Sequence, residues 1–176
     1  MYTPNPVCWH YEEFRAIMPI MPEGPIGEFG VFQGGATVQL ASFGRQVYAF
    51  DTFEGMPTNT PYDETIDNSN PPGKFIPEPT VVESLETYPN IKCVKGIFQE
   101  TLPVFDPSVR FAFAYLDCDW YSSYQCVVRW LSDRMRPGAV GLVDDYIMCD
   151  GCRKAIDEMV SEGLIEYQNP IIKWLH

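Results

Sequence analysis

Histidine is nearly absent from this sequence of 176 residues, which contains only His10 and His176. Ser-His-Asp and Cys-His catalysis both need a histidine as general base, so the sequence offers these enzyme classes almost no candidate residues. A zinc site at Cys149 and Cys152, the one CxxC pair, would also need nearby histidines or a second close pair of cysteines. We therefore interpret the six cysteines as packing thiols, with metal or redox chemistry as the alternative.

Positive charge is also scarce, because 12 lysines and arginines stand against 24 aspartates and glutamates, which gives a formal net charge of -12. Such a protein is repelled by phosphate backbones and anionic lipids, so nucleic acids and membrane surfaces are poor partners. No apolar run approaches the roughly 18 residues of a membrane span, and the first residues lack the basic and apolar regions of a signal peptide. The sequence predicts a soluble, cytoplasmic protein folded as one domain over residues 1–176.

Short apolar runs alternate with longer periodic segments, which is typical of an α/β fold with a mostly parallel sheet and helices on both faces. The predicted strands are 26–32, 47–50, 91–94, 111–116 and 139–143. The predicted helices are 7–18, within an N-terminal helix region 1–25, and the amphipathic segments 121–135 and 150–163.

Turn residues mark the ends of these elements. Ser122 or Ser123 is expected to cap the helix 121–135, and Pro137-Gly138 is expected to close it. The tail around Asn169-Pro170 predicts two short strands, which would form an antiparallel hairpin at the sheet edge.

Residues 56–80 differ from the rest of the chain, because they show no periodicity and contain six prolines and four acids. Connections of this length in compact domains are often functional. A lid over a site is one interpretation, and an ordinary surface loop is the other.

A glycine-rich turn follows the first predicted strand in GEFGVFQGGAT, residues 27–37. Small residues let a ligand approach the backbone, and the start of the next helix can receive a carboxylate or phosphate. Residues 30–35 read G-V-F-Q-G-G instead of the dinucleotide pattern GxGxxG, which argues against a pyrophosphate. Asp51 ends the second strand, where a carboxylate can bind both hydroxyls of a ribose. Together these features indicate an adenosine-type ligand without a pyrophosphate, a description that S-adenosylmethionine meets.

Two pairs of acids follow two predicted core strands: Asp117 and Asp119 after FAFAYL, and Asp144 and Asp145 after AVGLV. In a doubly wound sheet, ligands bind beyond the carboxyl ends of such strands. Unpaired carboxylates a few ångströms apart repel by roughly several kcal/mol at an effective dielectric near 20, so a cation would be needed to hold them together. Oxygen ligands with room for water favour Mg²⁺. The alternative is that the acids cap the two helices that follow.

Five motifs occur in the order found in the macrocin O-methyltransferase family, which the chain resembles over roughly residues 26–160. They are GEFGVFQGGAT, VYAFDTFEGMP, VKGIFQETLP, LDCDWYSSY, and VDDY followed by GCRKAIDE. The resemblance implies a class I methyltransferase fold, which is Rossmann-like, with S-adenosylmethionine as methyl donor and a divalent metal, normally Mg²⁺. It further implies an O-methyltransferase that acts on a sugar hydroxyl of a glycoside or another small natural product.

The resemblance also implies roles for individual residues. The implied metal ligands are Asp117, Asp144 and Asp145, and the implied general base is Asp119. The implied donor contacts are Glu28 and Gly30 at the methionine end, Asp51 at the ribose, Phe98 and Gln99 beside the adenine, and additionally Gly34, Thr52 and Asp117. A sugar hydroxyl is too weak an acid for an aspartate to deprotonate alone, so metal coordination and proton transfer to Asp119 would act together.

The acceptor is less strongly specified than the donor. Fuller family members carry a longer helical region before the first strand that shapes the acceptor pocket, whereas about 25 residues precede it here. Methylation of a catechol or another vicinal diol is one alternative, because the metal chelate would be the same. A donor-binding module that works with a partner chain is another, and a homodimer is compatible with the sequence.

Several aromatic and acidic side chains have two interpretations. Trp9, His10 and Tyr11 either pack or line the acceptor pocket, with His10 as an auxiliary base. Glu54 either caps a turn or reaches the cleft, and Trp120 and Tyr121 either line the pocket or pack. Trp130 and Trp174 are predicted core residues.

Overall fold

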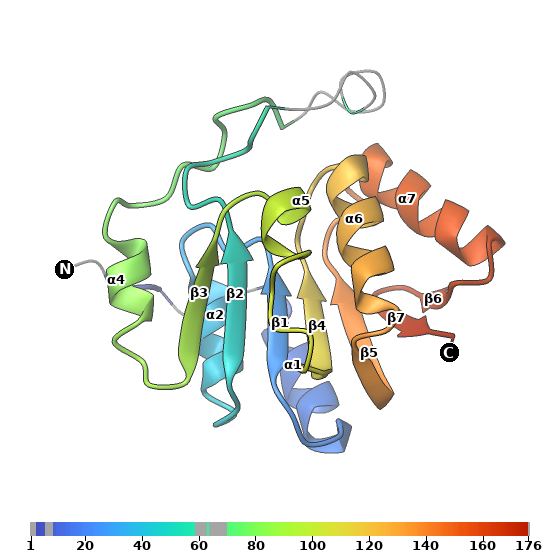
Figure 1. Ribbon diagram of the computed structural model, residues 1–176, viewed down its shortest axis with the longest axis horizontal. Helices are drawn as coiled ribbons and strands as arrows, with labels where there is room; N and C mark the ends of the chain where they lie inside the picture. The colour runs from blue at the N-terminus through green and yellow to red at the C-terminus, as the bar shows by residue number, and fades with distance from the viewer. Residues whose placement is uncertain (1–2, 6–8, 59–62, 64–69, 176) are drawn as a thin grey trace.

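A seven-stranded mixed sheet forms the centre of the fold, with the strand order β3-β2-β1-β4-β5-β7-β6 (Figure 1). The computed structural model describes residues 3–5, 9–58, 63 and 70–175. The strands are β1 (Ile26–Phe29), β2 (Val47–Asp51), β3 (Ile91–Lys95), β4 (Phe111–Leu116), β5 (Met135–Val143), β6 (Ile165–Gln168) and β7 (Ile171–Trp174). Strands β1 to β5 run parallel, whereas β7 pairs antiparallel with both β5 and β6. The predicted parallel sheet with a C-terminal antiparallel hairpin is confirmed.

Helices cover both faces of the sheet, as predicted. They are α1 (Tyr11–Ile17), the 3-10 helix η1 (Met18–Ile20), α2 (Gly35–Ala41), α4 (Val81–Leu85), α5 (Phe98–Thr101), α6 (Tyr121–Leu131) and α7 (Asp150–Ser161). Figure 1 shows α5, α6 and α7 in front of the sheet and α1 and α2 behind it. Each face has its own hydrophobic core, with Val127 of α6 and Ile156 of α7 in one and Phe14 of α1 and Leu40 of α2 in the other.

Strand β4, which precedes the first pair of acids, is buried over its whole length. Its sequence FAFAYL lacks polar alternation, because a central parallel strand with helices on both faces exposes neither side to water. It lies between β1 and β5 in the sheet. The carboxyl ends of these three parallel strands therefore meet at one edge, and the sheet topology brings the glycine turn and both acid pairs together there.

The structure corrects some predicted boundaries. Helix α6 ends at Leu131, four residues earlier than predicted, and β5 begins already at Met135. Pro137 and Gly138 therefore lie inside β5 instead of in a turn before it. The ladder between β4 and β5 shifts register in this part of the strand, and a proline is tolerated in a strand where the regular ladder is interrupted.

The first helix is also shorter than predicted. It begins at Tyr11, so Trp9 and His10 lie in the turn before it. Residues 7 and 8 of the predicted helix lie outside the described residues.

The connection between β2 and α4 contains the predicted lid, residues 56–80, and one described residue of it caps α6. The Asp63 carboxylate accepts hydrogen bonds from the Ser122 backbone N–H at 3.0 Å and from the Ser122 hydroxyl at 2.8 Å. The predicted capping by Ser122 or Ser123 is therefore wrong, since neither side chain caps the helix itself. Two parts of the predicted lid lie outside the described residues, 59–62 and 64–69.

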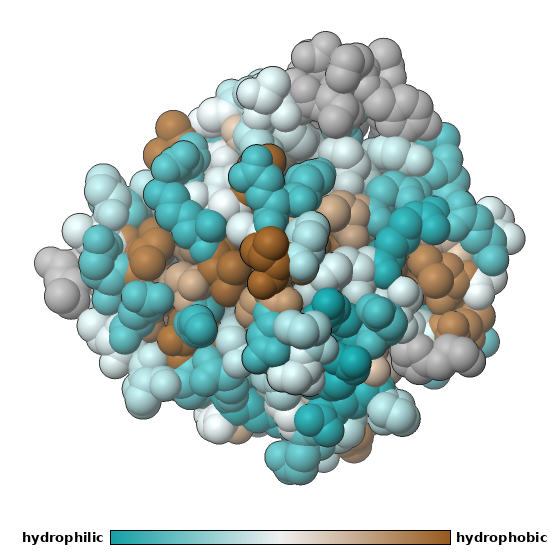
Figure 2. Space-filling model, in the orientation of Figure 1, coloured by the Kyte–Doolittle hydropathy of each residue, from teal (hydrophilic) through white to brown (hydrophobic). Residues whose placement is uncertain are grey.

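Figure 2 shows a mainly hydrophilic face on which hydrophobic side chains gather in small, separate groups. Over the described part of the chain, every helix is too short or too polar to span a membrane.

Candidate active site

The glycine turn brings β1 and β4 into close contact. Gly30 follows β1 with a φ of +94°, and a Cβ atom there would lie 1.8 Å from the carbonyl oxygen of Asp117. Gly34 has a φ of +76°, and a Cβ atom there would lie 2.7 Å from the side chain of Leu85. Both conformations and both contacts require glycine. The sequence was interpreted as making room for a ligand, whereas the two glycines make room for neighbouring parts of the chain.

Asp51 is the last residue of β2, and its carboxylate connects two turns. Oδ2 accepts hydrogen bonds from the backbone N–H groups of Val31 and Phe32, at 2.7 and 3.1 Å. Oδ1 accepts from the N–H of Phe53 at 2.7 Å and from the hydroxyl of Thr52 at 3.2 Å. An ionised carboxylate has about four acceptor sites. These bonds fix the side chain at the end of the strand where a ribose was predicted.

Three aspartates form the acidic centre of the site. Asp117 follows β4, Asp144 and Asp145 follow β5, and one carboxylate oxygen of each lies within 4.8 Å of the others. Two tyrosines hold them: the hydroxyl of Tyr115 donates to Asp144 Oδ1 at 2.9 Å, and that of Tyr124 donates to Asp145 Oδ2 at 2.8 Å. The cluster is thus built from strand ends and is oriented by hydroxyl groups from the protein core.

Burial and mutual repulsion raise the pKa of two of these carboxyl groups, Asp117 and Asp145. Burial raises the pKa of Asp117 well above its usual range, and the charges of Asp145 and Asp144 raise it further. Burial also raises the pKa of Asp145 to about 6, although the hydrogen bond from Tyr124 acts in the opposite direction. A nearby cation would restore the ionised forms. Because all donor atoms are hard oxygens, the residues suit Mg²⁺ or Ca²⁺, and they fit the metal that the resemblance implies.

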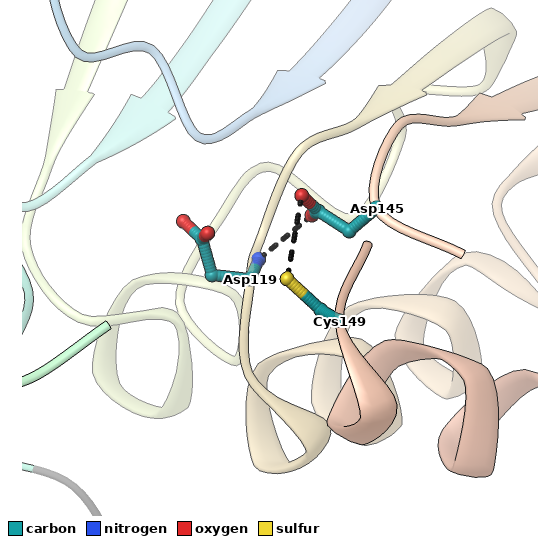
Figure 3. A group of neighbouring side chains, drawn as sticks. All are labelled: Asp119, Asp145 and Cys149. Carbon is teal, nitrogen blue, oxygen red and sulfur yellow. Dashed lines mark hydrogen bonds between the residues drawn. The ribbon is translucent and has the colours of Figure 1, made fainter. Parts of the chain in front are cut away.

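Asp119 lies beside this cluster but is oriented differently. Its φ is +59°, and its backbone N–H donates to Asp145 Oδ2 at 3.0 Å. Figure 3 shows that the Asp119 carboxylate points away from Asp145 and from the thiol of Cys149. Burial raises its pKa to about 8, and the charge of Asp145 contributes in the same direction. Single donor atoms of Asp119, Asp145 and Cys149 also lie within 4.8 Å of one another, so a role of Asp119 as a metal ligand is the alternative to a role as base.

The acids border a cavity of about 530 Å³, a size typical of sites for small organic ligands. Nine of the predicted site residues line it: Gly30, Asp51, Thr52, Phe98, Gln99, Asp117, Asp119, Asp144 and Asp145. The other two predicted site residues, Glu28 and Gly34, are not among the described residues that line the cavity. Glu28 is buried within β1 and is only 1% exposed. The structure therefore brings the predicted base, metal and ribose residues to one cavity, with two of the predicted donor contacts behind its wall.

The segment before α1 reaches this cavity. Trp9 lines it, and His10 Nε2 lies 2.7 Å from Asp144 Oδ1. The hydrogen bond with Asp144 raises the pKa of His10. Of the two interpretations, lining the pocket describes Trp9 better than packing. His10 reaches the acidic cluster through Asp144, and Tyr11 is exposed on α1.

The remaining ambiguous residues divide between pocket and core. Trp120 lines the cavity, but the hydroxyl of Tyr121 donates to Glu158 of α7 at 2.6 Å. Glu54 does neither of the things predicted for it, because its carboxylate pairs with Lys95 Nζ at 2.8 Å on the surface.

The predicted core and thiol residues pack as expected. Trp174 is buried, and Trp130 is partly buried against the same core. The described cysteines are free thiols, and Cys149 and Cys152 both lie in that core. Cys8 lies outside the described residues.

Four side chains that organise the site were missed in the sequence: Tyr115, Tyr124, Asn70 and Lys74. Tyr115 was visible as the one polar side chain of FAFAYL, directly before the acids. Tyr124 lay in the predicted helix and resembled any core aromatic residue. Asn70 and Lys74 lie in the aperiodic connection, where the sequence carries no signal of what the backbone approaches.

The chain is similar in sequence to known O-methyltransferases. The family profile of macrocin-O-methyltransferase (TylF) matches residues 15–174 of the chain. An O-methyltransferase from Streptomyces olivaceus, named for the 4'-position of 8-demethyl-8-(2,3-dimethoxy-alpha-L-rhamnosyl)-tetracenomycin-C, is 27% identical over 174 residues, covering 87% of this chain and 66% of the relative. Mycinamicin III 3''-O-methyltransferase from Micromonospora griseorubida is 25% identical over 174 residues, covering 86% of this chain and 68% of the relative. The chain spans about two thirds of the length of these relatives.

Solved structures show the same fold. The O-methyltransferase NovP superposes with a TM-score of 0.73 at 24% identity, over 95% of this chain and 79% of that chain. An O-methyltransferase from Bacillus cereus, in complex with SAH, gives a TM-score of 0.62 at 16% identity, over 91% of this chain and 73% of that chain. The predicted class I, Rossmann-like methyltransferase fold is confirmed. Since the family profile also covers nearly the whole sequence, the chain belongs to the macrocin-O-methyltransferase family.

Proposed function

We propose that this chain is a Mg²⁺-dependent O-methyltransferase that uses S-adenosylmethionine to methylate a sugar hydroxyl of a natural product. The observation that carries the proposal is the convergence of Asp117, Asp119, Asp144 and Asp145 on one cavity that Asp51 also lines. Family membership supports methyl transfer as the reaction class. The sugar acceptor is supported by the name of the Streptomyces olivaceus relative, which specifies a rhamnosyl compound.

The donor would lie across the carboxyl ends of β1 and β2. Asp51 is held by backbone amides. The hydroxyl of Thr52, whose bond to Oδ1 is the longest at 3.2 Å, would give way to a ribose hydroxyl. Phe98 and Gln99, at the start of α5, would border the adenine. The donor supplies a methyl group on a positively charged sulfur and leaves as S-adenosylhomocysteine.

Asp117, Asp144 and Asp145 would hold the metal. Tyr115 and Tyr124 would orient these ligands, because each donates a hydrogen bond to one of the three carboxylates. Bound Mg²⁺ would supply a Lewis acid and a template for two neighbouring hydroxyls of the acceptor.

Asp119 would accept the proton of the reacting hydroxyl. As the oxygen–carbon bond forms and the carbon–sulfur bond breaks, the hydroxyl proton passes to the Asp119 carboxylate. The base needs to share the proton only in the transition state, so an aspartate suffices once the hydroxyl is polarised.

The proposal is tested by incubating the purified protein with S-adenosylmethionine, Mg²⁺ and a panel of rhamnosyl and other glycosides, with catechols as a second panel. Mass spectrometry should detect one added methyl group on a glycoside, and a chelator should abolish the transfer. Transfer to catechols alone would replace the sugar acceptor by a vicinal aromatic diol. Donor binding without transfer to either panel would favour a donor-binding module, and absence of donor binding would refute the proposal altogether.

A further inference from the structure

Asn70 connects the predicted lid to the proposed base. The residue is buried, with 9% of its surface exposed, and its amide Nδ2 donates a hydrogen bond to Asp119 Oδ1. The same nitrogen lies 4.0 Å from the thiol of Cys149. Asn70 comes from the connection between β2 and α4, whereas Asp119 follows β4, so this contact joins parts of the chain that are 49 residues apart.

The orientation of the Asn70 amide is fixed from both ends. Lys74 Nζ donates to Asn70 Oδ1 at 2.5 Å, while Nδ2 faces the Asp119 carboxylate. Rotating the amide by half a turn would set its oxygen against the carboxylate and its N–H groups against the ammonium, which is unfavourable at both ends. The side chain therefore presents a donor, and not an acceptor, to Asp119.

Main-chain contacts hold Asn70 in this position. The indole Nε1 of Trp120 donates to the Asn70 carbonyl oxygen at 3.0 Å. A few residues later, the N–H of Gly73 donates to the Met56 carbonyl oxygen, and the N–H of Met56 donates to that of Lys74, both at 2.8 Å. The stretch from Asn70 to Lys74 is thus tied both to the start of α6 and to the beginning of the same connection.

We propose that Asn70 is a positioning residue for Asp119. Its amide holds Oδ1, so that the other carboxylate oxygen is directed at the acceptor hydroxyl. The inference rests on the proposed function, because it assigns Asp119 the role of base. It adds that the base is oriented only while Asn70 keeps its contacts with Asp119 and Trp120, so that this part of the connection contributes to proton transfer.

Asn70→Leu, which keeps the approximate shape and removes both hydrogen bonds, is the main variant. Because a misplaced base forfeits much of its contribution, the single-turnover rate of methyl transfer should fall about 10- to 100-fold. Lys74→Met should have a smaller effect in the same direction, since the amide remains but loses its orienting partner.

Lys173→Met, which makes the same change on an exposed position of β7, is the matched control and should leave the rate unchanged. Affinity for S-adenosylhomocysteine, measured by calorimetry, should be the same in all variants and reports that they are folded.

A double-mutant cycle with Asp119→Asn separates positioning from a general structural effect. If Asn70 acts through Asp119, Asn70→Leu should cause no further loss of rate once Asp119 is replaced. An equal loss in both backgrounds, or a parallel loss of donor affinity, would overturn the inference. If the parent protein is active and Asn70→Leu transfers methyl groups at the same rate, the inference is also overturned, while the proposed function is unaffected. A parent protein that transfers no methyl group would instead refute the proposed function, and this inference with it.

Discussion

Replacing Glu28 by glutamine is expected to change how the stability of this protein depends on pH. Glu28 lies in the middle of the sheet, where Ala49 of β2 and Tyr115 of β4 flank it in register. Neither of its carboxylate oxygens makes a hydrogen bond of normal geometry within the described structure. Burial raises its pKa from 4.5 to about 8; the Thr37 hydroxyl acts against this rise, and the charge of Asp51 adds to it.

The sign and size of the effect follow from this pKa. Between pH 4.5 and pH 8 the folded protein keeps a proton that the unfolded chain releases, so the free energy of unfolding falls as the pH rises through this window. At about 1.36 kcal/mol per pKa unit, the complete loss amounts to about 5 kcal/mol, of which about 3 kcal/mol is reached by pH 7. Relaxation of the protein around the charge makes these values upper limits. Glutamine cannot ionise, so Glu28→Gln should gain stability relative to the parent across the same window.

Urea denaturation at pH 5, 6, 7 and 8, with a chelator present throughout, measures the difference in unfolding free energy between variant and parent. A buried amide adds an offset of its own, but that offset does not depend on pH, so the slope is the diagnostic quantity. Glu166→Gln on β6, an exposed position, measures the effect of the same chemical change outside the core. A difference between Glu28→Gln and the parent that stays constant with pH, or that shrinks as the pH rises, would refute the account of Glu28 as a protonated core residue.

Four further experiments address the site. Asp51→Ala removes the carboxylate expected to bind the ribose and should weaken S-adenosylhomocysteine binding at least about tenfold in calorimetry; unchanged affinity would remove Asp51 from the donor site. Asp119→Asn should keep its affinity for Mg²⁺ and lose about 10²- to 10⁴-fold in single-turnover rate, and a loss of metal instead would make Asp119 a ligand. Metal binding and activity should disappear together on alanine replacement of any implied ligand, namely Asp117, Asp144 or Asp145. The segment 56–80 should become protected from proteolysis when donor and acceptor are present, and equal cleavage with and without them would leave it as an ordinary loop.

The parts of the fold that could be predicted are those in which local pattern and sheet topology determine the answer. FAFAYL could hardly be anything other than a central strand, and β4 is buried throughout. Once β4 and β5 are neighbours, residues that directly follow them must lie close together. The convergence of Asp117, Asp144 and Asp145 therefore follows from their places in the sequence, without any knowledge of side-chain contacts.

The parts that could not be predicted depend on contacts between distant segments. Residues 132–138 contain a proline and a glycine and so indicate a turn. Yet β5 begins at Met135, which pairs with Phe111 of β4 before the ladder shifts register. Asp63 and Asn70 lie in a stretch without periodicity, and only the folded chain reveals that one caps α6 and the other contacts Asp119. Gly30 was correctly singled out, but its neighbour is the backbone of Asp117, which the sequence cannot specify.

Backbone conformation explains how two acids separated by one residue, Asp117 and Asp119, come to face different groups. In an extended chain Asp117 and Asp119 would point to the same side, because side chains alternate along a strand. Asp119 instead has a φ of +59°, which turns its N–H toward Asp145 and its carboxylate toward Asn70. A left-handed conformation costs a non-glycine residue roughly 1–2 kcal/mol, and such conformations persist where the surroundings impose them, often at functional sites. Glycine would adopt this φ without strain but has no carboxylate. An aspartate in this conformation, with its carboxylate at the cavity, supports the proposal that Asp119 serves the site.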